Sequence, residues 1–264
     1  MPLTLSVIRL NYRVVRAKKR FGQNFLADQT IVSKIIEATS DLSFEIVEIG
    51  PGLGDLTEAI LARGNLSAIE IDGDLIAVLK KRFAAAITRG ELTLINADAL
   101  EAWKTGLSSK PYAIIANLPY YAATEIILRA LRDPLCRVIV VMTQLEVAQK
   151  FCGANGANSL SLLVQSIGSA ELLFKVPKEA FRPAPKVESA VIRIVKTKPS
   201  YDEGFSNFLK EAFRAPRKRL TNNIKTSIET LKSIGANENT RAGELSLEQF
   251  ETLYKGIKSG SGNA

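Results

Sequence analysis

The sequence predicts an α/β fold: a mainly parallel sheet covered by helices on both faces, followed by a small helical domain. The first observation is that short apolar runs alternate with amphipathic helical patterns up to about residue 168, as in βαβ units. The second is that the pattern is all helical from Asp202 onward. The third is length, because 264 residues suffice for one large α/β domain and a small appendage.

The first 150 residues carry the alternating part. Five short apolar runs are expected to be strands, at Phe44–Ile49, Leu66–Ile71, Leu92–Asn96, Tyr112–Ala116 and Val138–Met142. Helical spacing of apolar residues predicts helices at Ile31–Ala38, Leu56–Ala62, Leu75–Ile87 and Ala123–Leu131. Asp55 is the expected N-cap of the second of these helices, with Glu58 at its third position.

After residue 168 the pattern changes. Leu172–Val176 and Ala190–Val195 are expected strands joined by a Pro-rich connection, so the last strand of the sheet is expected to be antiparallel. Three helices are expected after them, at Asp202–Arg214, Lys218–Leu231 and Leu247–Ile257, the last with a capping box of Ser246 and Gln249. These patterns predict an N-terminal arm (residues 1–26), an α/β domain (residues 27–198) and a helical C-terminal domain (residues 199–264).

Composition excludes several kinds of site. The absence of histidine excludes Ser-His and Cys-His catalysis and any zinc site that needs imidazole, and two cysteines cannot form a Cys₄ site. No metal is therefore expected. A net charge of +8 suits a polyanionic partner. No apolar run reaches about 18 residues, so no membrane span is expected. The basic N-terminal arm is interpreted as part of a cytoplasmic protein, the alternative being an organellar transit peptide.

A glycine-rich loop, Gly50-Pro-Gly-Leu-Gly54, follows the first expected strand. Glycines there let the backbone approach a ligand closely, and Glu70, at the end of the next strand, can accept both hydroxyl groups of a ribose. Asp55 stands where a dinucleotide fingerprint has glycine and would repel a pyrophosphate. A nucleoside without phosphate, S-adenosylmethionine, fits better, with Asp98 accepting from its adenine amine; the alternative is a tight turn with an N-capping acid.

The tetrad Asn117-Leu118-Pro119-Tyr120 follows the fourth expected strand. If the Asn117 side-chain oxygen and the Pro119 carbonyl accept the two N–H bonds of an adenine amine, the nitrogen lone pair becomes available for methyl transfer. Tyr120 would stack on the base, which must be outside a helix. In isolation the tetrad is equally well explained as an Asn-x-Pro turn with a surface tyrosine; its position after the glycine loop, Glu70 and Asp98 favours catalysis.

Over residues 18–257 the chain resembles the ribosomal RNA adenine dimethyltransferases that modify two adjacent adenosines near the 3′ end of small-subunit rRNA. The matching segments are Lys19–Leu26, Val47–Gly52, Ile69–Asp72, Asp98, Asn117–Tyr120, Phe181–Ala190, Arg217–Arg219 and Arg241–Leu247. The resemblance implies a Rossmann-like class I methyltransferase sheet. It also implies rRNA adenine N6,N6-dimethylation with S-adenosylmethionine and a role in small-subunit biogenesis.

The resemblance also assigns residues. Residues up to Leu26 would fold over the bound cofactor. Phe181 would face Tyr120 across the target base, the alternative being a core residue beside a Pro-stiffened turn. The family pattern differs at Leu145, usually Lys, and at Ala157–Ser161, which puts local RNA contacts in question. The expected cofactor contacts are Gln23, Asn24, Leu26, Gly50, Gly52, Glu70, Ile71, Asp98, Ala99 and Asn117.

Two basic runs, residues 175–198 and 210–225, suggest a surface that follows phosphates. Their members expected to bind RNA are Arg182, Lys186, Arg217, Lys218 and Arg219. The hypothesis is that a monomer docks on small-subunit rRNA within a preformed ribosomal particle. The alternatives are a methyltransferase of the macrolide-resistance type acting on large-subunit rRNA, a ribosome-assembly or transcription factor without catalysis, and a dinucleotide oxidoreductase.

Overall fold

The computed structural model describes residues 17–18, 21–198 and 201–260, so most of the expected N-terminal arm lies outside the described residues. The described residues form two compact units. The first comprises those of Met1–Ala148 and Leu172–Arg193, and the second those of Gln149–Glu171 and Ile194–Ala264. The second unit thus includes residues 149–171, which the sequence pattern placed with the α/β domain.

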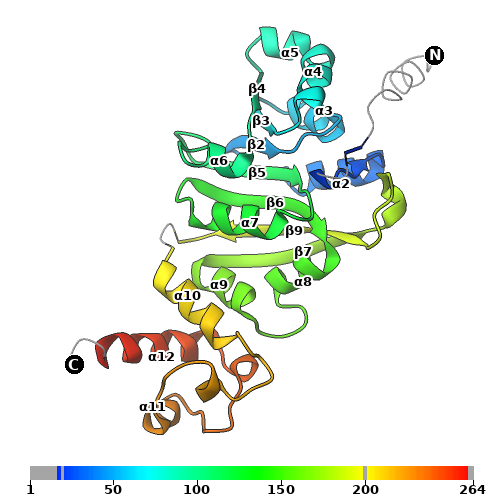
Figure 1. Cartoon of the computed structure of the whole chain (residues 1–264). Helices are drawn as coiled ribbons and strands as arrows, with labels where there is room; N and C mark the ends of the chain where they lie inside the picture. The colour runs from blue at the N-terminus through cyan, green and yellow to red at the C-terminus, as the bar shows by residue number, and fades with distance from the viewer. Residues whose placement is uncertain (1–16, 19–20, 199–200, 261–264) are drawn as a thin grey trace. The chain divides into compact units, whose positions relative to one another are not determined.

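A seven-stranded sheet organises the fold, with strand order β4-β3-β2-β5-β6-β9-β7 (Figure 1). The pairs β2–β3, β3–β4, β2–β5 and β5–β6 are parallel. This confirms the predicted α/β class with a mostly parallel sheet. The strands are β2 (Glu45–Ile49), β3 (Leu66–Glu70), β4 (Leu92–Asn96), β5 (Tyr112–Asn117), β6 (Cys136–Gln144), β7 (Gly168–Val176) and β9 (Ser189–Lys196).

The far edge of the sheet is antiparallel, as predicted. The Thr197 N–H, just after β9, donates to the carbonyl of Ile167, just before β7, at 3.0 Å. The end of β9 therefore lies beside the start of β7, so the two strands run in opposite directions. Only glycine fits at position 168, where β7 begins, because a Cβ there would lie 1.9 Å from the Val195 carbonyl oxygen.

Six helices and the first half of a seventh, α8, belong to the first unit. Central strand β5 explains why helices cover the sheet, because Tyr112 through Ala116 are each at most 1% exposed and are buried on both faces. Helices α2 and α3 lie side by side, and α3 packs against β3 (Figure 1). The helices are α2 (Gln29–Glu37), α3 (Asp55–Leu61), α4 (Gly73–Arg82), α5 (Ala84–Thr88), α6 (Ala99–Ala102), α7 (Ala123–Arg132) and α8 (Leu145–Cys152).

Two local predictions in this unit are wrong. The N-cap of α3 is Gly54, not Asp55, because Gly54 adopts a left-handed conformation (φ 93°) that ends the glycine loop one residue earlier. The expected single helix at residues 75–87 is two helices, α4 and α5, separated at Phe83. Phe83 packs against Gly54, since a Cβ on Gly54 would lie 2.6 Å from the Phe83 ring.

A second, two-stranded sheet joins β1 (Phe25–Leu26) to β8 (Phe181–Arg182). The pairing is antiparallel, with Leu26 opposite Phe181. A 3₁₀ turn, η3 (Lys178–Ala180), precedes β8, and its Ala180 carbonyl accepts the Ala27 N–H at 2.8 Å. The segment before α2 is thereby tied to a segment more than 150 residues later in the chain.

The second unit is helical apart from the ends of β7 and β9. The capping box of α12 is confirmed, since the Gln249 side chain accepts the Ser246 N–H at 2.8 Å and the Ser246 hydroxyl accepts the Gln249 N–H at 3.3 Å. An aromatic cluster of Phe205, Phe208 and Tyr254 joins α10 to α12. The elements are α9 (Ser159–Ile167), α10 (Glu203–Ala212), η4 (Leu220–Asn222), α11 (Ile228–Ser233), η5 (Ala242–Glu244) and α12 (Leu247–Gly260).

The expected helix at Lys218–Leu231 is wrong. Only the short turn η4 and helix α11 form there. The buried side chain of Asn223 donates to the backbone carbonyls of Ala212 and Ala215 at the end of α10, at 2.7 and 3.2 Å. A polar side chain bonded to a neighbouring backbone competes with helix formation, so the chain stays irregular between the two elements. None of the described helices is long and apolar enough to span a membrane.

Candidate active site

A cavity of about 1100 Å³, including space open to solvent, lies at the carboxyl ends of β2 to β5 within the first unit. Its walls come from the segment before α2, the glycine loop, and the residues that follow β3, β4 and β5. Every residue expected to contact a cofactor lies in this lining, and so do Pro119 and Tyr120. The parallel topology explains this convergence, because the carboxyl ends of neighbouring parallel strands meet at one edge of the sheet.

Glu70 is held rigidly at the end of β3. Its side chain is 4% exposed, and its two oxygens accept the N–H groups of Gly52 at 3.2 Å and Asp72 at 2.9 Å. Burial raises the pKa of Glu70, and these two hydrogen bonds oppose that effect. Each carboxylate oxygen has a second lone pair, so Glu70 can still accept hydrogen bonds from ligand hydroxyl groups.

The described lining of the cavity is acidic. Glu48, Asp55, Glu70 and Asp98 contribute to it, and among the described residues no lysine or arginine does. Glu48, which the sequence reading missed, is 1% exposed, and burial raises its pKa to about 8 although the Thr57 hydroxyl donates to it at 2.7 Å. Such a cavity favours a cationic ligand and disfavours a phosphate.

The segment before α2 is held by polar contacts. The Lys18 ammonium donates to Asp72 at 2.6 Å and to Asp74 at 2.5 Å, both at the start of α4. The Gln23 amide donates to Asp72 at 2.9 Å and accepts the Lys18 N–H at 2.8 Å. Burial alone would raise the pKa of Asp72, but the hydrogen bonds from Lys18 and Gln23 lower it below its ordinary value.

Asn117 is oriented by the same segment. Its side-chain nitrogen donates to the backbone carbonyl of Asn24 at 3.2 Å. That bond determines which way the amide is turned, because the nitrogen must face Asn24. No described residue donates to the side-chain oxygen, so it remains available as an acceptor beside the cavity.

The rest of the tetrad forms a turn. The Pro119 carbonyl accepts the Ala122 N–H at 3.0 Å, so one of its lone pairs is already used. The Leu118 carbonyl receives no hydrogen bond from a described residue, and the sequence reading did not consider it. The Tyr120 hydroxyl lies 2.6 Å from the Ser189 hydroxyl of β9, which holds the ring in place, and burial raises the Tyr120 pKa.

Phe181 lies outside the cavity lining. It is 0% exposed and pairs with Leu26 in the two-stranded sheet. In this conformation it is a core residue, and its stacking role stays a prediction that requires a rearrangement of β8.

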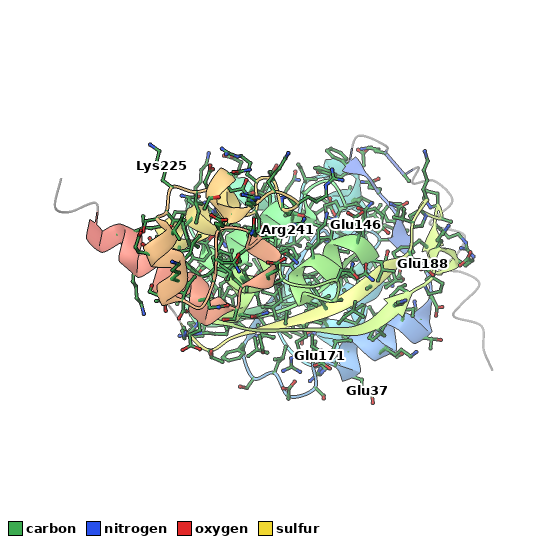
Figure 2. All side chains as sticks on the ribbon, turned by 90° about the horizontal axis from the view of Figure 1, so that it is seen from below. Glu37, Glu146, Glu171, Glu188, Lys225 and Arg241 are labelled. Atoms are coloured by element: carbon green, nitrogen blue, oxygen red, sulfur yellow. The ribbon has the colours of Figure 1, made fainter. Side chains whose placement is uncertain are left out.

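The basic residues differ in how freely they can meet a phosphate. Arg182 and Lys186 are exposed in the first unit, although the Arg182 guanidinium donates to the carbonyls of Glu179 and Phe181 at 2.8 Å. In the second unit, Lys225 extends away from the fold (Figure 2). The exposed set there also contains Arg217, Lys218 and Arg219.

Two other members of the expected basic runs are not free for RNA. Arg193 pairs with Asp41 at 2.5 Å and donates to the Ala38 carbonyl at 3.1 Å. Lys196 is only 6% exposed. Fewer basic residues of 175–198 are therefore available to bind phosphates than the sequence suggested.

One departure from the family pattern has a structural role. In Ala157–Ser161, the Asn158 side chain accepts the N–H groups of Leu160 and Ser161, at 3.0 and 3.1 Å. The Ser161 hydroxyl in turn accepts the Asn158 N–H at 3.1 Å, which completes a capping box for α9. This stretch therefore starts a helix that the sequence reading did not predict.

Comparison with known proteins agrees with this geometry. The family model described as ribosomal RNA adenine dimethylase matches residues 14–259. The chain is 44% identical over 257 residues to the ribosomal RNA small subunit methyltransferase A of Campylobacter jejuni, covering 93% of this chain and 96% of that protein. It is 45% identical over 259 residues to the protein of the same name from Aliarcobacter butzleri, covering 93% and 98%.

Solved structures give the same fold. The crystal structure of the 23S rRNA methyltransferase ErmE matches with a TM-score of 0.72 and 25% identity, covering 89% of this chain and 100% of that chain. A dimethyladenosine transferase from Plasmodium falciparum matches with a TM-score of 0.74 and 22% identity, covering 89% and 98%. The second likeness concerns the fold alone.

Proposed function

This chain belongs to the ribosomal RNA adenine dimethylase family, and we propose that its cavity binds S-adenosylmethionine beside an adenine of small-subunit rRNA. Membership makes it an S-adenosylmethionine-dependent rRNA adenine dimethyltransferase of the small subunit. We propose that it forms N6,N6-dimethyladenosine at two adjacent adenosines near the 3′ end of that rRNA. The observation that carries the site assignment is one cavity that joins two ligand-facing acids, Glu70 and Asp98, to an asparagine whose oxygen is left free.

The cavity suits this cofactor. When bound, S-adenosylmethionine supplies an electrophilic methyl group on a positively charged sulfur and carries no phosphate. The acidic lining favours such a cation, although Glu48, with a pKa of about 8, stays protonated at neutral pH. Glu70 offers paired acceptors for ribose hydroxyl groups. The Asp98 side chain, which accepts the Leu100 N–H at 2.8 Å, is placed beside the next strand end for the adenine amine.

The tetrad prepares the target amine. Asn117 Oδ1 accepts one N–H of the adenine amine, and a carbonyl of the Leu118-Pro119 turn accepts the other. These two acceptors withdraw the nitrogen lone pair from the ring and orient it toward the electrophile. Because Asn117 Nδ2 is bound to Asn24, its oxygen is already oriented before substrate arrives, so no reorganisation is needed at the moment of reaction.

The substrate assignment follows the relatives. Those from Campylobacter jejuni and Aliarcobacter butzleri are named for the small subunit, and they match at 44–45% identity, against 25% for the large-subunit enzyme ErmE. We further propose that the enzyme acts in the cytoplasm as a monomer on a ribosomal particle. The exposed arginines and lysines of each unit support binding to the phosphates of rRNA.

The test is to incubate unmethylated small subunits and large subunits separately with labelled S-adenosylmethionine and to map the modified positions. We expect two adjacent dimethyladenosines near the 3′ end of small-subunit rRNA and no label in the large subunit. Label on a single large-subunit adenine would contradict this proposal and favour a methyltransferase of the macrolide-resistance type. Absence of label in both, with a protein that binds the cofactor, would favour a binding factor without catalysis.

A further inference from the structure

Tyr121 is an aromatic residue at the cavity mouth that the chemistry above leaves unused. It lines the cavity and is 65% exposed, more than any other large hydrophobic residue in the described part of the chain. Exposure alone would mean little, because single exposed aromatic residues are common on protein surfaces. The contacts of its ring, however, indicate a role at the cavity.

The ring of Tyr121 meets the segment before α2. It projects from the Pro119–Ala122 turn, which the Ala122 N–H closes on the Pro119 carbonyl at 3.0 Å. A Cβ built on Gly22 would lie 3.3 Å from the ring, so the ring edge packs directly on the glycine backbone. Gly22 also lines the cavity, and the two residues therefore form adjoining parts of its rim.

The electrostatic surroundings show which part of the cavity Tyr121 faces. Its pKa is raised by burial first and then by the negative charges of Asp98 and Glu70. Tyr120, one residue earlier, responds to burial and to Ser189 of β9. The Tyr120 hydroxyl is thus bonded to Ser189 of β9. The ring of Tyr121 instead stays exposed at the rim of the cavity that Asp98 and Glu70, the carboxylates assigned to the adenosine half of the cofactor, also line.

We propose that Tyr121 is a cofactor-retaining residue whose ring covers the adenosine half of the bound cofactor and, with Gly22, forms the aperture through which the cofactor is exchanged. This inference rests on the proposed function of the cavity. An aromatic ring gains by contact with a nucleoside, and the contact removes apolar surface from water. Because each adenine takes two methyl groups, the spent cofactor must be replaced between transfers, so the aperture acts more than once for every base.

The experiment measures binding of S-adenosylhomocysteine in the absence of RNA, by calorimetry, with the dissociation rate from stopped flow. We expect Tyr121→Ala to raise the Kd roughly tenfold, toward the low end of a base–aromatic stack, mainly through faster dissociation. Tyr121→Phe keeps the ring and should stay within about twofold of the parent. Phe44→Ala is the matched control, since Phe44 is 36% exposed and precedes β2 at the opposite end of the sheet.

The outcomes separate this inference from the proposal beneath it. An unchanged Kd in Tyr121→Ala, with a parent protein that binds, overturns the cofactor role. If the same variant then shows a raised KM for rRNA, the ring serves a nucleotide beside the target base. A parent protein that binds no S-adenosylhomocysteine contradicts the proposed function itself. Equal thermal unfolding of all four proteins excludes a folding defect, which a substitution at a largely exposed side chain should not cause.

Discussion

The two sides of the cavity are built differently. On one side, Glu70 and Asn117 terminate strands β3 and β5 of the central sheet. On the other side, the segment before α2 is attached by the ion pairs of Lys18 and by hydrogen bonds from Gln23 and to Asn24. The first side cannot move without disturbing a buried strand. On the second side, β1 is paired with β8, but residues 21–24, which precede β1, are held by polar contacts that each contribute little to stability.

This difference assigns different tasks to the two sides. Chemistry requires acceptors held within a fraction of an ångström, which strand ends provide. Exchange of the cofactor requires a wall that can open, which a segment held by polar contacts provides. Asn117 links the sides, because it terminates a strand and also holds the segment through Asn24.

The largest effect is expected at that link. Asn117→Ala removes the acceptor that is proposed to prepare the adenine amine, and we expect kcat to fall roughly 100- to 1000-fold, as for other single groups that stabilise a transition state. The Kd for S-adenosylhomocysteine should change far less, because Glu70 and Asp98 are untouched. Methylation kinetics and calorimetry on the same protein measure both. A kcat within tenfold of the parent would show that the strand-end side does not perform the chemistry.

Gly54→Ala tests whether the strand-end side of the cavity depends on packing between the glycine loop and the core. At Gly54 the added Cβ would lie 2.6 Å from Phe83, and the φ of 93° strains any other residue. We expect a loss of about 2–4 kcal/mol in the free energy of unfolding, combining overpacking and backbone strain. Gly90→Ala is the control, because Gly90 has φ +74° but nothing within 4 Å of the added Cβ. Equal losses in denaturant unfolding would mean that only backbone strain matters.

Elements that depend on local sequence were predicted, and elements that depend on a distant side chain were not. The central strands were located because a buried parallel strand is a continuous apolar run, as in Tyr112–Ala116 of β5. The breaks were missed where one side chain acts over a distance. Phe83 divides a helix by packing on Gly54. Asn223 keeps the chain between η4 and α11 irregular by bonding to the carbonyl of Ala212, the last residue of α10. Local periodicity contains no trace of such partners.

The site residues were likewise predicted where the topology alone brings them together. Residues at strand ends, such as Glu70, Asp98 and Asn117, could be placed together because parallel topology brings strand ends to one edge. Glu48 and Tyr121 were missed, although an acid inside an apolar strand and a second aromatic after the tetrad were visible signals. Phe181 depends on a pairing with Leu26 that no local pattern reveals.

The pH dependence of stability tests whether burial keeps Glu48 protonated in the folded protein. Burial raises its pKa to about 8, above the ordinary 4.5. Between these values the folded protein holds a proton that the unfolded chain has released, so the free energy of unfolding falls as pH rises through this window. Glu48→Gln keeps an acceptor for Thr57 and removes the ionisation. Without cofactor, we expect the variant to exceed the parent by roughly 2 kcal/mol at pH 9 and to match it near pH 5.

Denaturant unfolding at several pH values gives this comparison. Glu101→Gln, which alters an exposed carboxylate on α6, is the control and should leave the pH dependence as it is. Parallel curves for the parent and Glu48→Gln would show that Glu48 ionises normally. Glu48 would then add a negative charge to the cavity at neutral pH.

The smallest effect is expected on the movable side, at Lys18. Lys18→Met keeps the aliphatic chain and removes the charge that pairs with Asp72 and Asp74. We expect the Kd for S-adenosylhomocysteine to rise about two- to fivefold, the range of partly exposed ion pairs, while kcat at saturating cofactor stays unchanged. Because salt screens exposed pairs, the difference between variant and parent should shrink at about 1 M salt. Lys104→Met removes the comparable pair with Glu101 outside the cavity and should have no effect. A fall in kcat without a change in Kd would contradict the division of tasks, since the segment would then position the reacting groups.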